Sequence, residues 1–144
     1  MLNRFSKEGL LSDDKRKIVQ FEENGMTYKG INETSKRVLR YSIDGGIIAE
    51  NIKKCDKALY LPDSSTVYFV ELKGCNLKRA AEQIYQTLIT LGASLDDCVI
   101  HGRAVCSRIQ TPDVRSSQII QLERELAKRN GSFKKSCRIF SEDI

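Results

Sequence analysis

The sequence predicts an α/β protein with a mixed central sheet flanked by helices, and three observations indicate this fold class. Residues 36–74 alternate short apolar runs with the turn signals "DGG" and "PDSS", which is typical of antiparallel strands. Residues 77–140 alternate helical and extended patterns, which favours parallel strands joined by crossover helices. The chain has 144 residues and no internal repeat, so a single domain over residues 1–144 is expected.

The first part of the chain is predicted to form one helix followed by antiparallel strands. Ser12, with two aspartates after it, has the features of a helix start and Gly25 those of a stop, which predicts a helix over residues 12–25. A hairpin turn is expected at residues 44–46 and a second turn at residues 62–65. The strands predicted around these turns cover residues 36–43, 47–52, 54–61 and 66–74.

The second part of the chain begins with a change to helical spacing at Leu77. Apolar residues fall on one helical face at Leu77, Ala80, Ala81, Ile84 and Leu88. Gly92 is the expected end of this helix. A strand at 98–109, a helix at 111–131 and a strand at 132–140 complete the predicted order.

The charge of the chain favours a polyanionic partner. Twenty-four basic and nineteen acidic side chains give a net charge of +5, which suits DNA and also RNA. No apolar run approaches the ~18 residues that a membrane span requires. The first residues, "MLNRFSKEGLLSDDKRK", lack the apolar stretch of a secretory signal, so no membrane partner and a cytoplasmic location are expected.

The cysteine and histidine pattern excludes several kinds of site. Five cysteines form no CxxC pair, which argues against a disulfide framework and against a four-cysteine zinc site. The single histidine, His101, lies in the extended stretch "CVIHGRAVC", where a structural or surface role is expected. Carboxylates are therefore the better candidates for chemistry.

Two carboxylates are predicted to meet across the turn at residues 62–65. Asp56 lies six residues before Pro62 and Glu71 lies six residues after Ser65, so a regular hairpin places them nearly opposite each other. Their Cβ atoms would then be about 5 Å apart. Carboxylates at that distance repel unless a cation lies between them, either a divalent metal or a lysine.

The strand "VYFVELKG" ends in Glu71, Leu72 and Lys73. Because side chains alternate along a strand, Glu71 and Lys73 point to the same side. Asp56 followed by "VELK" at residues 70–73 resembles the PD-(D/E)xK nuclease superfamily, which includes restriction enzymes, Holliday-junction resolvases and recombination exonucleases. The resemblance covers mainly residues 44–88 and implies a restriction-endonuclease-like fold.

The resemblance also implies roles for particular residues. Asp56 and Glu71 would be ligands of Mg²⁺, for which Mn²⁺ would substitute, and Lys73 would be the catalytic lysine. Gln83 matches the glutamine that the following helix often presents to the site. The backbone carbonyl of Leu72 is a natural third ligand, because Mg²⁺ takes oxygen ligands and keeps several waters.

Several positions leave alternatives open. Asp44 and Glu50 are further ligand candidates, although a turn accounts for Asp44 and a solvated strand for Glu50. The superfamily often adds a glutamate from its first helix, and here Glu22, Glu23 and Glu50 are the choices. Cys55 stands where the proline of the family name would be. The helix reads "QIYQT", so the QxxxY signature of the recombination nucleases is absent.

The basic residues near these carboxylates suit a phosphate-binding cleft. They are Lys53, Lys54, Lys57, Lys78 and Arg79. The sequence thus predicts a Mg²⁺-dependent DNA endonuclease whose specificity comes from a homodimer or from a partner protein. The alternative is a catalytically inert nuclease-fold protein that binds nucleic acid or a protein partner.

Overall fold

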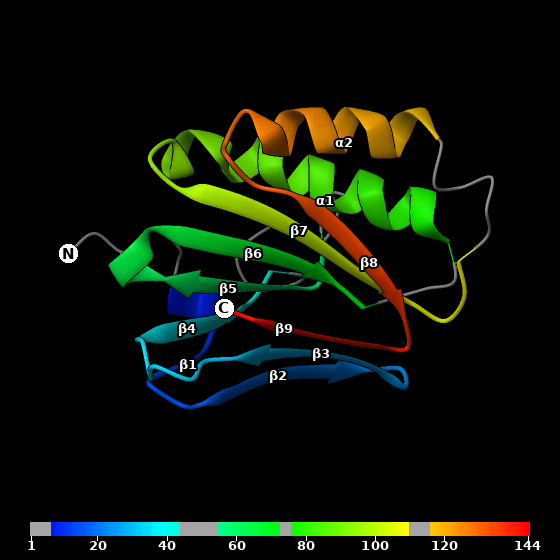
Figure 1. The fold of residues 1–144 in the computed structure, drawn as a ribbon. Helices are drawn as coiled ribbons and strands as arrows, with labels where there is room; N and C mark the ends of the chain where they lie inside the picture. The colour runs from blue at the N-terminus through cyan, green and yellow to red at the C-terminus, as the bar shows by residue number, and fades with distance from the viewer. Residues whose placement is uncertain (1–6, 44–54, 73–75, 110–115) are drawn as a thin grey trace.

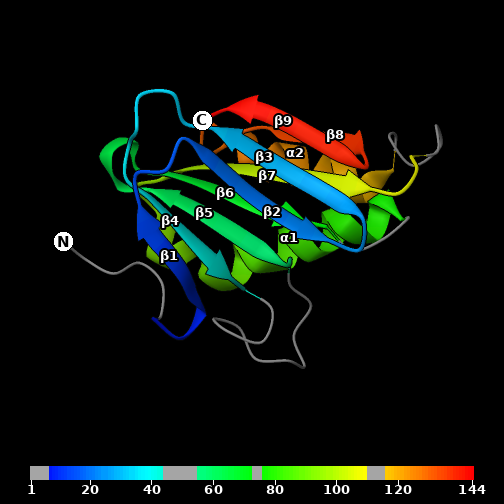
Figure 2. The ribbon, with the colours of Figure 1, turned by 90° about the horizontal axis from the view of Figure 1, so that it is seen from below.

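The computed structural model describes residues 7–43, 55–72, 76–109 and 116–144. Within these residues, a six-stranded sheet has the order β1-β4-β5-β6-β7-β8 and a three-stranded sheet has the order β2-β3-β9. The helices α1 and α2 cover one face of the large sheet, and the small sheet covers the other (Figures 1 and 2). The strands are β1 (Leu10–Asp14), β2 (Ile18–Glu23), β3 (Met26–Ile31), β4 (Val38–Ser42), β5 (Lys57–Leu61), β6 (Thr66–Glu71), β7 (Val99–Cys106), β8 (Phe133–Cys137) and β9 (Ile139–Asp143), and the helices are α1 (Leu77–Leu91) and α2 (Ser117–Ala127).

The large sheet is mixed, which confirms the predicted α/β class. Neighbouring strands from β1 through β4 and β5 to β6 are antiparallel. The pairs β6–β7 and β7–β8 are parallel, with α1 and α2 as their crossover connections. Strand β6 is central, and after its first residue every side chain is buried, as expected for a strand covered on both faces.

Most predicted elements are present in the described residues, with shorter bounds. The strands predicted at 36–43 and 54–61 are β4 and β5, and the helix predicted from Leu77 is α1. Gly92 directly follows α1, as expected, although a short 3-10 helix, Gly92–Leu95, continues the chain. The hairpin turn predicted at 44–46 and the strand predicted at 47–52 lie outside the described residues.

The helix predicted over residues 12–25 is wrong, because this segment contributes to strands β1 and β2. Val19 and Phe21 are buried while Ile18 and Glu22 are exposed, a period of two that belongs to a strand. The supposed helix stop is the turn of the β2–β3 hairpin. Asn24 and Gly25 have φ angles of 54° and 75°, which a tight hairpin turn requires.

The strand predicted at 132–140 is divided into β8 and β9, which belong to different sheets. Arg138, with a φ of 63°, separates them. Its backbone N–H donates to the carbonyl of Cys106 in the large sheet at 2.9 Å, and its carbonyl accepts from the N–H of Thr27 in the small sheet at 2.8 Å. The chain therefore passes from one sheet to the other at this single residue.

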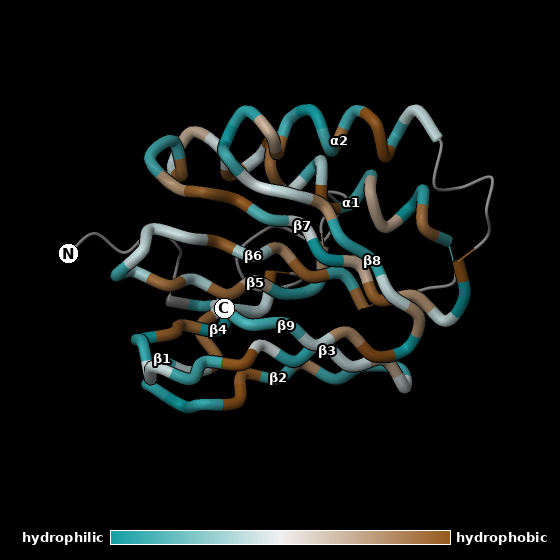
Figure 3. Tube along the Cα trace, in the orientation of Figure 1, coloured by the Kyte–Doolittle hydropathy of each residue, from teal (hydrophilic) through white to brown (hydrophobic). Residues whose placement is uncertain are grey.

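Two apolar clusters fill the spaces between the three layers. One lies between the helices and the large sheet and includes Phe69, Leu77 and Ile84. The other lies between the two sheets and includes Phe21 and Tyr28. Polar and apolar residues are interspersed along both helices, as expected for helices with one buried face (Figure 3). Among the described residues, no helix combines the length and the apolar character needed to cross a membrane.

A buried ion pair also joins the two sheets. Arg103 of β7 is only 2% exposed, and its Nε donates to Oε2 of Glu142 in β9 at 2.7 Å. The same carboxylate oxygen accepts from the hydroxyl of Tyr28 in β3 at 2.8 Å. Nη1 of Arg103 donates to the carbonyls of Gly102 and Ser132. A charge buried between apolar layers is thus met by a countercharge and by backbone acceptors, as burial requires.

Candidate functional site

Asp56 and Glu71 lie against each other at the start of β5 and the end of β6. The antiparallel register pairs Lys57 with Val70, so the next pair outward is Asp56 with Glu71. The N–H of Asp56 donates to Oε1 of Glu71 at 3.0 Å. The N–H of Leu72 donates in return to Oδ2 of Asp56 at 2.8 Å. This is the juxtaposition that counting outward from the turn predicts.

Both carboxylates are buried on the side of the sheet that faces the helices. Asp56 is 2% exposed and Glu71 is 1% exposed. Their neighbours on the same face, Ala58 and Phe69, belong to the cluster beneath the helices. Burial of two acidic groups is costly unless hydrogen bonds or positive charge compensate. The two backbone N–H donors supply part of this compensation and fix the carboxylates relative to each other.

Helix α1 contacts this site through Thr87. The Thr87 hydroxyl accepts the N–H of Cys55 at 2.8 Å and donates to the carbonyl of Gln83 at 2.8 Å. Cys55 is fully buried, and its burial, together with the charge of Glu71, raises the pKa of its thiol far above the usual range. The thiol therefore stays protonated and acts as a packing group. Free cysteines are often buried in protein interiors, where they pack as small apolar side chains.

Of the other residues singled out from the sequence, some lie on β5 and α1 and some lie outside the described residues. Gln83 is half-buried and precedes Thr87 by one helical turn, so it lies on the same side of α1 as the contact with Cys55. Lys57 follows Asp56 directly and is half-buried. Lys78 and Arg79 are exposed in the first turn of α1. Those that lie outside the described part of the chain are Asp44, Glu50, Lys53, Lys54 and Lys73.

The glutamate expected from a first helix is not supplied by residues 22 and 23. Glu22 and Glu23 lie at the end of β2, in the small sheet, because the segment folds as a hairpin. In the ranges that the structure describes, no group of three or more His, Cys, Asp or Glu side chains is placed to hold a metal ion. Among the described residues, Asp56 and Glu71 are the two side chains that could hold a metal ion at this site.

These donors fit a hard divalent cation better than a soft one. Both side chains supply carboxylate oxygens, and the carbonyl of Leu72 would add a third oxygen from the adjoining backbone. Mg²⁺ is usually held by one or two carboxylates and keeps several waters, so a third acidic side chain is not required. Cys55 lies next to Asp56, and its fully buried thiol donates to the carbonyl of Lys57 at 3.6 Å.

His101 has the structural role expected from its strand. Its Nδ1 accepts the N–H of Ser132 at 3.1 Å, and its ring stacks on Tyr68 with centroids 4.8 Å apart. Partial burial, followed by the charge of Arg103, lowers the pKa of His101. The neutral ring therefore links β7 to the turn before β8.

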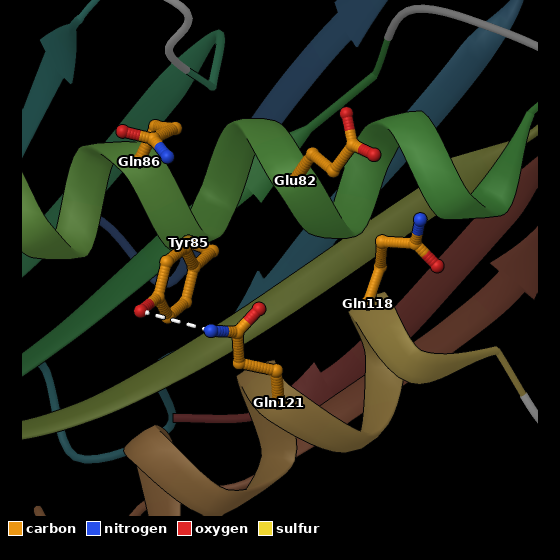
Figure 4. Close-up of a pocket in the computed structure, with 5 residues that line it drawn as sticks. All are labelled: Glu82, Tyr85, Gln86, Gln118 and Gln121. Atoms are coloured by element: carbon orange, nitrogen blue, oxygen red, sulfur yellow. Dashed lines mark hydrogen bonds between the residues drawn. The ribbon is translucent and has the colours of Figure 1, made fainter.

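A groove between α1 and α2 was not anticipated from the sequence. It has a volume of about 420 Å³ and lies on the outer side of the helices (Figure 4). Its lining residues are Glu82, Tyr85, Gln86, Gln118 and Gln121. Nε2 of Gln121 donates to the Tyr85 hydroxyl at 3.2 Å across it. Because the groove forms only where the two helices meet, neither helix alone carries a signal for it.

A second hollow lies at the start of α1. It is lined by Asn76, Lys78, Arg79 and Glu82, so it shares Glu82 with the groove. It contains two of the basic residues expected to contact nucleic acid, Lys78 and Arg79. The side chain of Asn76 accepts the N–H of Arg79 at 3.2 Å and caps the helix.

Comparisons with protein-family models, with curated proteins and with solved structures find no match to this chain.

Proposed function

We propose that the protein is a metal-dependent nuclease that hydrolyses phosphodiester bonds in DNA, as an endonuclease. One observation carries the proposal: the carboxylates of Asp56 and Glu71 are buried at the ends of adjacent strands, where the Glu71 carboxylate accepts the N–H of Asp56 and the Asp56 carboxylate accepts the N–H of Leu72. Buried acidic pairs are unfavourable for folding, so their presence favours a functional role. The residues after Glu71 lead directly into α1, as the resemblance to PD-(D/E)xK nucleases implies.

The roles of the residues follow from this resemblance and from their chemistry. Asp56, Glu71 and the carbonyl of Leu72 would hold Mg²⁺ or Mn²⁺. The bound ion would neutralise phosphate charge and acidify a water molecule. Lys73 would donate a hydrogen bond to the attacking water, and Gln83 would orient a phosphate or a water from the side of α1.

Substrate binding would depend on the basic residues around the acidic pair. Lys57 adjoins Asp56, and Lys78 and Arg79 line the hollow at the start of α1. Together with Lys53 and Lys54, they would bind the phosphates on either side of the cleaved bond. A domain of this size has little surface for reading a long sequence, so a homodimer or a partner protein would supply specificity.

The second candidate is a nuclease-fold protein that binds DNA, RNA or a protein partner without cleavage. The observation that favours it is the small number of acidic ligands. In the part of the chain that is described, the acidic pair has no third carboxylate arranged with it as a metal ligand. Each carboxylate also accepts a backbone N–H, which a structural role would require.

Nicking of supercoiled plasmid in Mg²⁺ or Mn²⁺ separates the two candidates. Asp56→Asn, Glu71→Gln and Lys73→Ala should each lower the nicking rate by more than about 100-fold, since even outer groups of metal sites are worth about 10- to 100-fold. Glu123→Gln, a change on the exposed face of α2, is the control and should nick at the wild-type rate. Plasmid binding without nicking, in a wild-type protein that binds no Mn²⁺, would favour the inert alternative.

A further inference from the structure

The hydroxyl of Thr87 accepts a hydrogen bond from the backbone N–H of Cys55, and this bond connects helix α1 to the segment that carries Asp56. Thr87 lies within α1, is 0% exposed, and its hydroxyl contacts the carbonyl of Gln83 and the N–H of Cys55. A carbonyl can only accept and an N–H can only donate, so the direction of both bonds is fixed. The Thr87 proton points to Gln83, and a lone pair points to Cys55.

Cys55 immediately precedes Asp56, in the segment before regular strand β5 begins. The N–H of Asp56 is bound by the side chain of Glu71, and its carbonyl accepts the N–H of Ile43 at 3.0 Å. The N–H of Cys55 is held from the helix side by Thr87. The backbone of Asp56 is therefore held by two hydrogen bonds, and that of the preceding residue, Cys55, by a third, which Thr87 supplies from α1.

We propose that Thr87 is a positioning residue, which sets Asp56 against Glu71 and thereby sets the spacing of the oxygens offered to a divalent cation. The inference deepens the proposed function and rests on it. Helix α1 follows the strand that ends in Glu71, so a single strand-helix unit carries one carboxylate and holds the backbone next to the other. A shift of this unit would move both ligands together.

Threonine is not favoured inside a helix on grounds of propensity, because its branched side chain loses rotamer freedom there. Two substitutions distinguish the contribution of the Thr87 hydroxyl from that of its methyl group. Thr87→Val keeps the branched shape and removes the hydroxyl, whereas Thr87→Ser keeps the hydroxyl and removes a methyl group. Thr90 provides a matched control: its hydroxyl donates to the carbonyl of Gln86 at 2.8 Å in the same way, but the residue is exposed.

The test is the affinity for Mn²⁺, measured by titration calorimetry on full-length proteins whose circular dichroism shows them to be folded. Thr87→Val should weaken Mn²⁺ binding by about 10-fold, the size expected for an outer group of a metal site. Thr87→Ser and Thr90→Val should stay within about twofold of wild type. Equal affinity of Thr87→Val and wild type would overturn the inference and leave the proposed function intact.

A second measurement tests the positioning role of Thr87 in the absence of any metal ion. Amide hydrogen exchange should become faster at Cys55, Asp56 and Leu72 in Thr87→Val than in Thr90→Val, while the amide of Tyr28 in the small sheet is unchanged between them. Uniform acceleration at all amides would mean a loss of global stability only and would refute positioning. Absence of Mn²⁺ binding and of nicking in wild type would refute the proposed function, whatever the exchange result.

Discussion

The Arg103–Glu142 ion pair gives the most direct test of what joins the two sheets. Glu142→Gln keeps the size of the side chain and removes its charge. The guanidinium of Arg103 then remains at 2% exposure without its countercharge. Loss of one partner of a buried pair costs about 3–5 kcal/mol. Arg103 keeps the carbonyls of Gly102 and Ser132 as acceptors, so we expect the lower end, about 3 kcal/mol.

Urea unfolding followed by far-ultraviolet circular dichroism measures this loss, since the chain has no tryptophan to report on unfolding. Tyr28→Phe removes one hydrogen bond to the same carboxylate and should cost less, about 1.5 kcal/mol. Lys128→Met removes an exposed ion pair with Glu125 and should change stability by no more than about 0.5 kcal/mol. If Glu142→Gln lowers the free energy of unfolding by less than about 1 kcal/mol, the reasoning about the buried ion pair is refuted.

Two further predictions concern backbone packing and pH. Gly131→Ala should abolish folding or severely destabilise the protein in the same urea assay, because a Cβ there would lie 1.6 Å from the Ile100 carbonyl oxygen. In Gly25→Ala the new Cβ meets no atom within 4 Å. This change should lower the free energy of unfolding by only about 1–2 kcal/mol, because residue 25 has a positive φ. The lowered pKa of His101 means that the unfolded chain takes up a proton near pH 6.5 while the folded chain does not, so stability is lost as the pH falls below that value. His101→Asn should show a shallower dependence of unfolding free energy on pH between about 5 and 7, and an unchanged slope would contradict this cause.

The β5–β6 hairpin of the large sheet was predictable because its pairing is local. The turn after β5 fixes the register of the β5–β6 hairpin, and counting outward from it brings Asp56 to Glu71. Helix α1 was equally accessible from its apolar spacing. Both predictions depend on residues fewer than twenty positions apart, where periodicity and turn chemistry determine the outcome.

The small sheet was not predictable in the same way. Strand β3 pairs in parallel with β9, and Tyr28 reaches Glu142 across 114 positions of sequence. No local pattern specifies such a pairing. The error over residues 12–25 had a local cause: Ser12 and the aspartates after it have the features of a helix start, but they lie on the edge strand β1. Asn24–Gly25 is a hairpin signal, and a glycine at this position also suits the end of a helix.

The contribution of Thr87 to the candidate site was also hidden in the sequence. A threonine within an amphipathic helix has no pattern that separates a solvated hydroxyl from one bonded to a neighbouring strand. Thr87 and Thr90 illustrate this, since both hydroxyls bond the carbonyl four residues earlier and only Thr87 is buried against Cys55. The distinction arises from how α1 packs on the large sheet.

The passage of the chain through Arg138 has a consequence during synthesis on the ribosome. The β2–β3 hairpin is translated before every strand of the large sheet except β1, yet among the described strands the second edge of β3 is paired by β9, which follows Arg138. Until that strand leaves the ribosomal tunnel, the nascent protein presents an open strand edge beside the apolar side chains of Val19 and Phe21. Because β9 follows β8 in the chain, the small sheet is completed only after the strands of the large sheet have been translated.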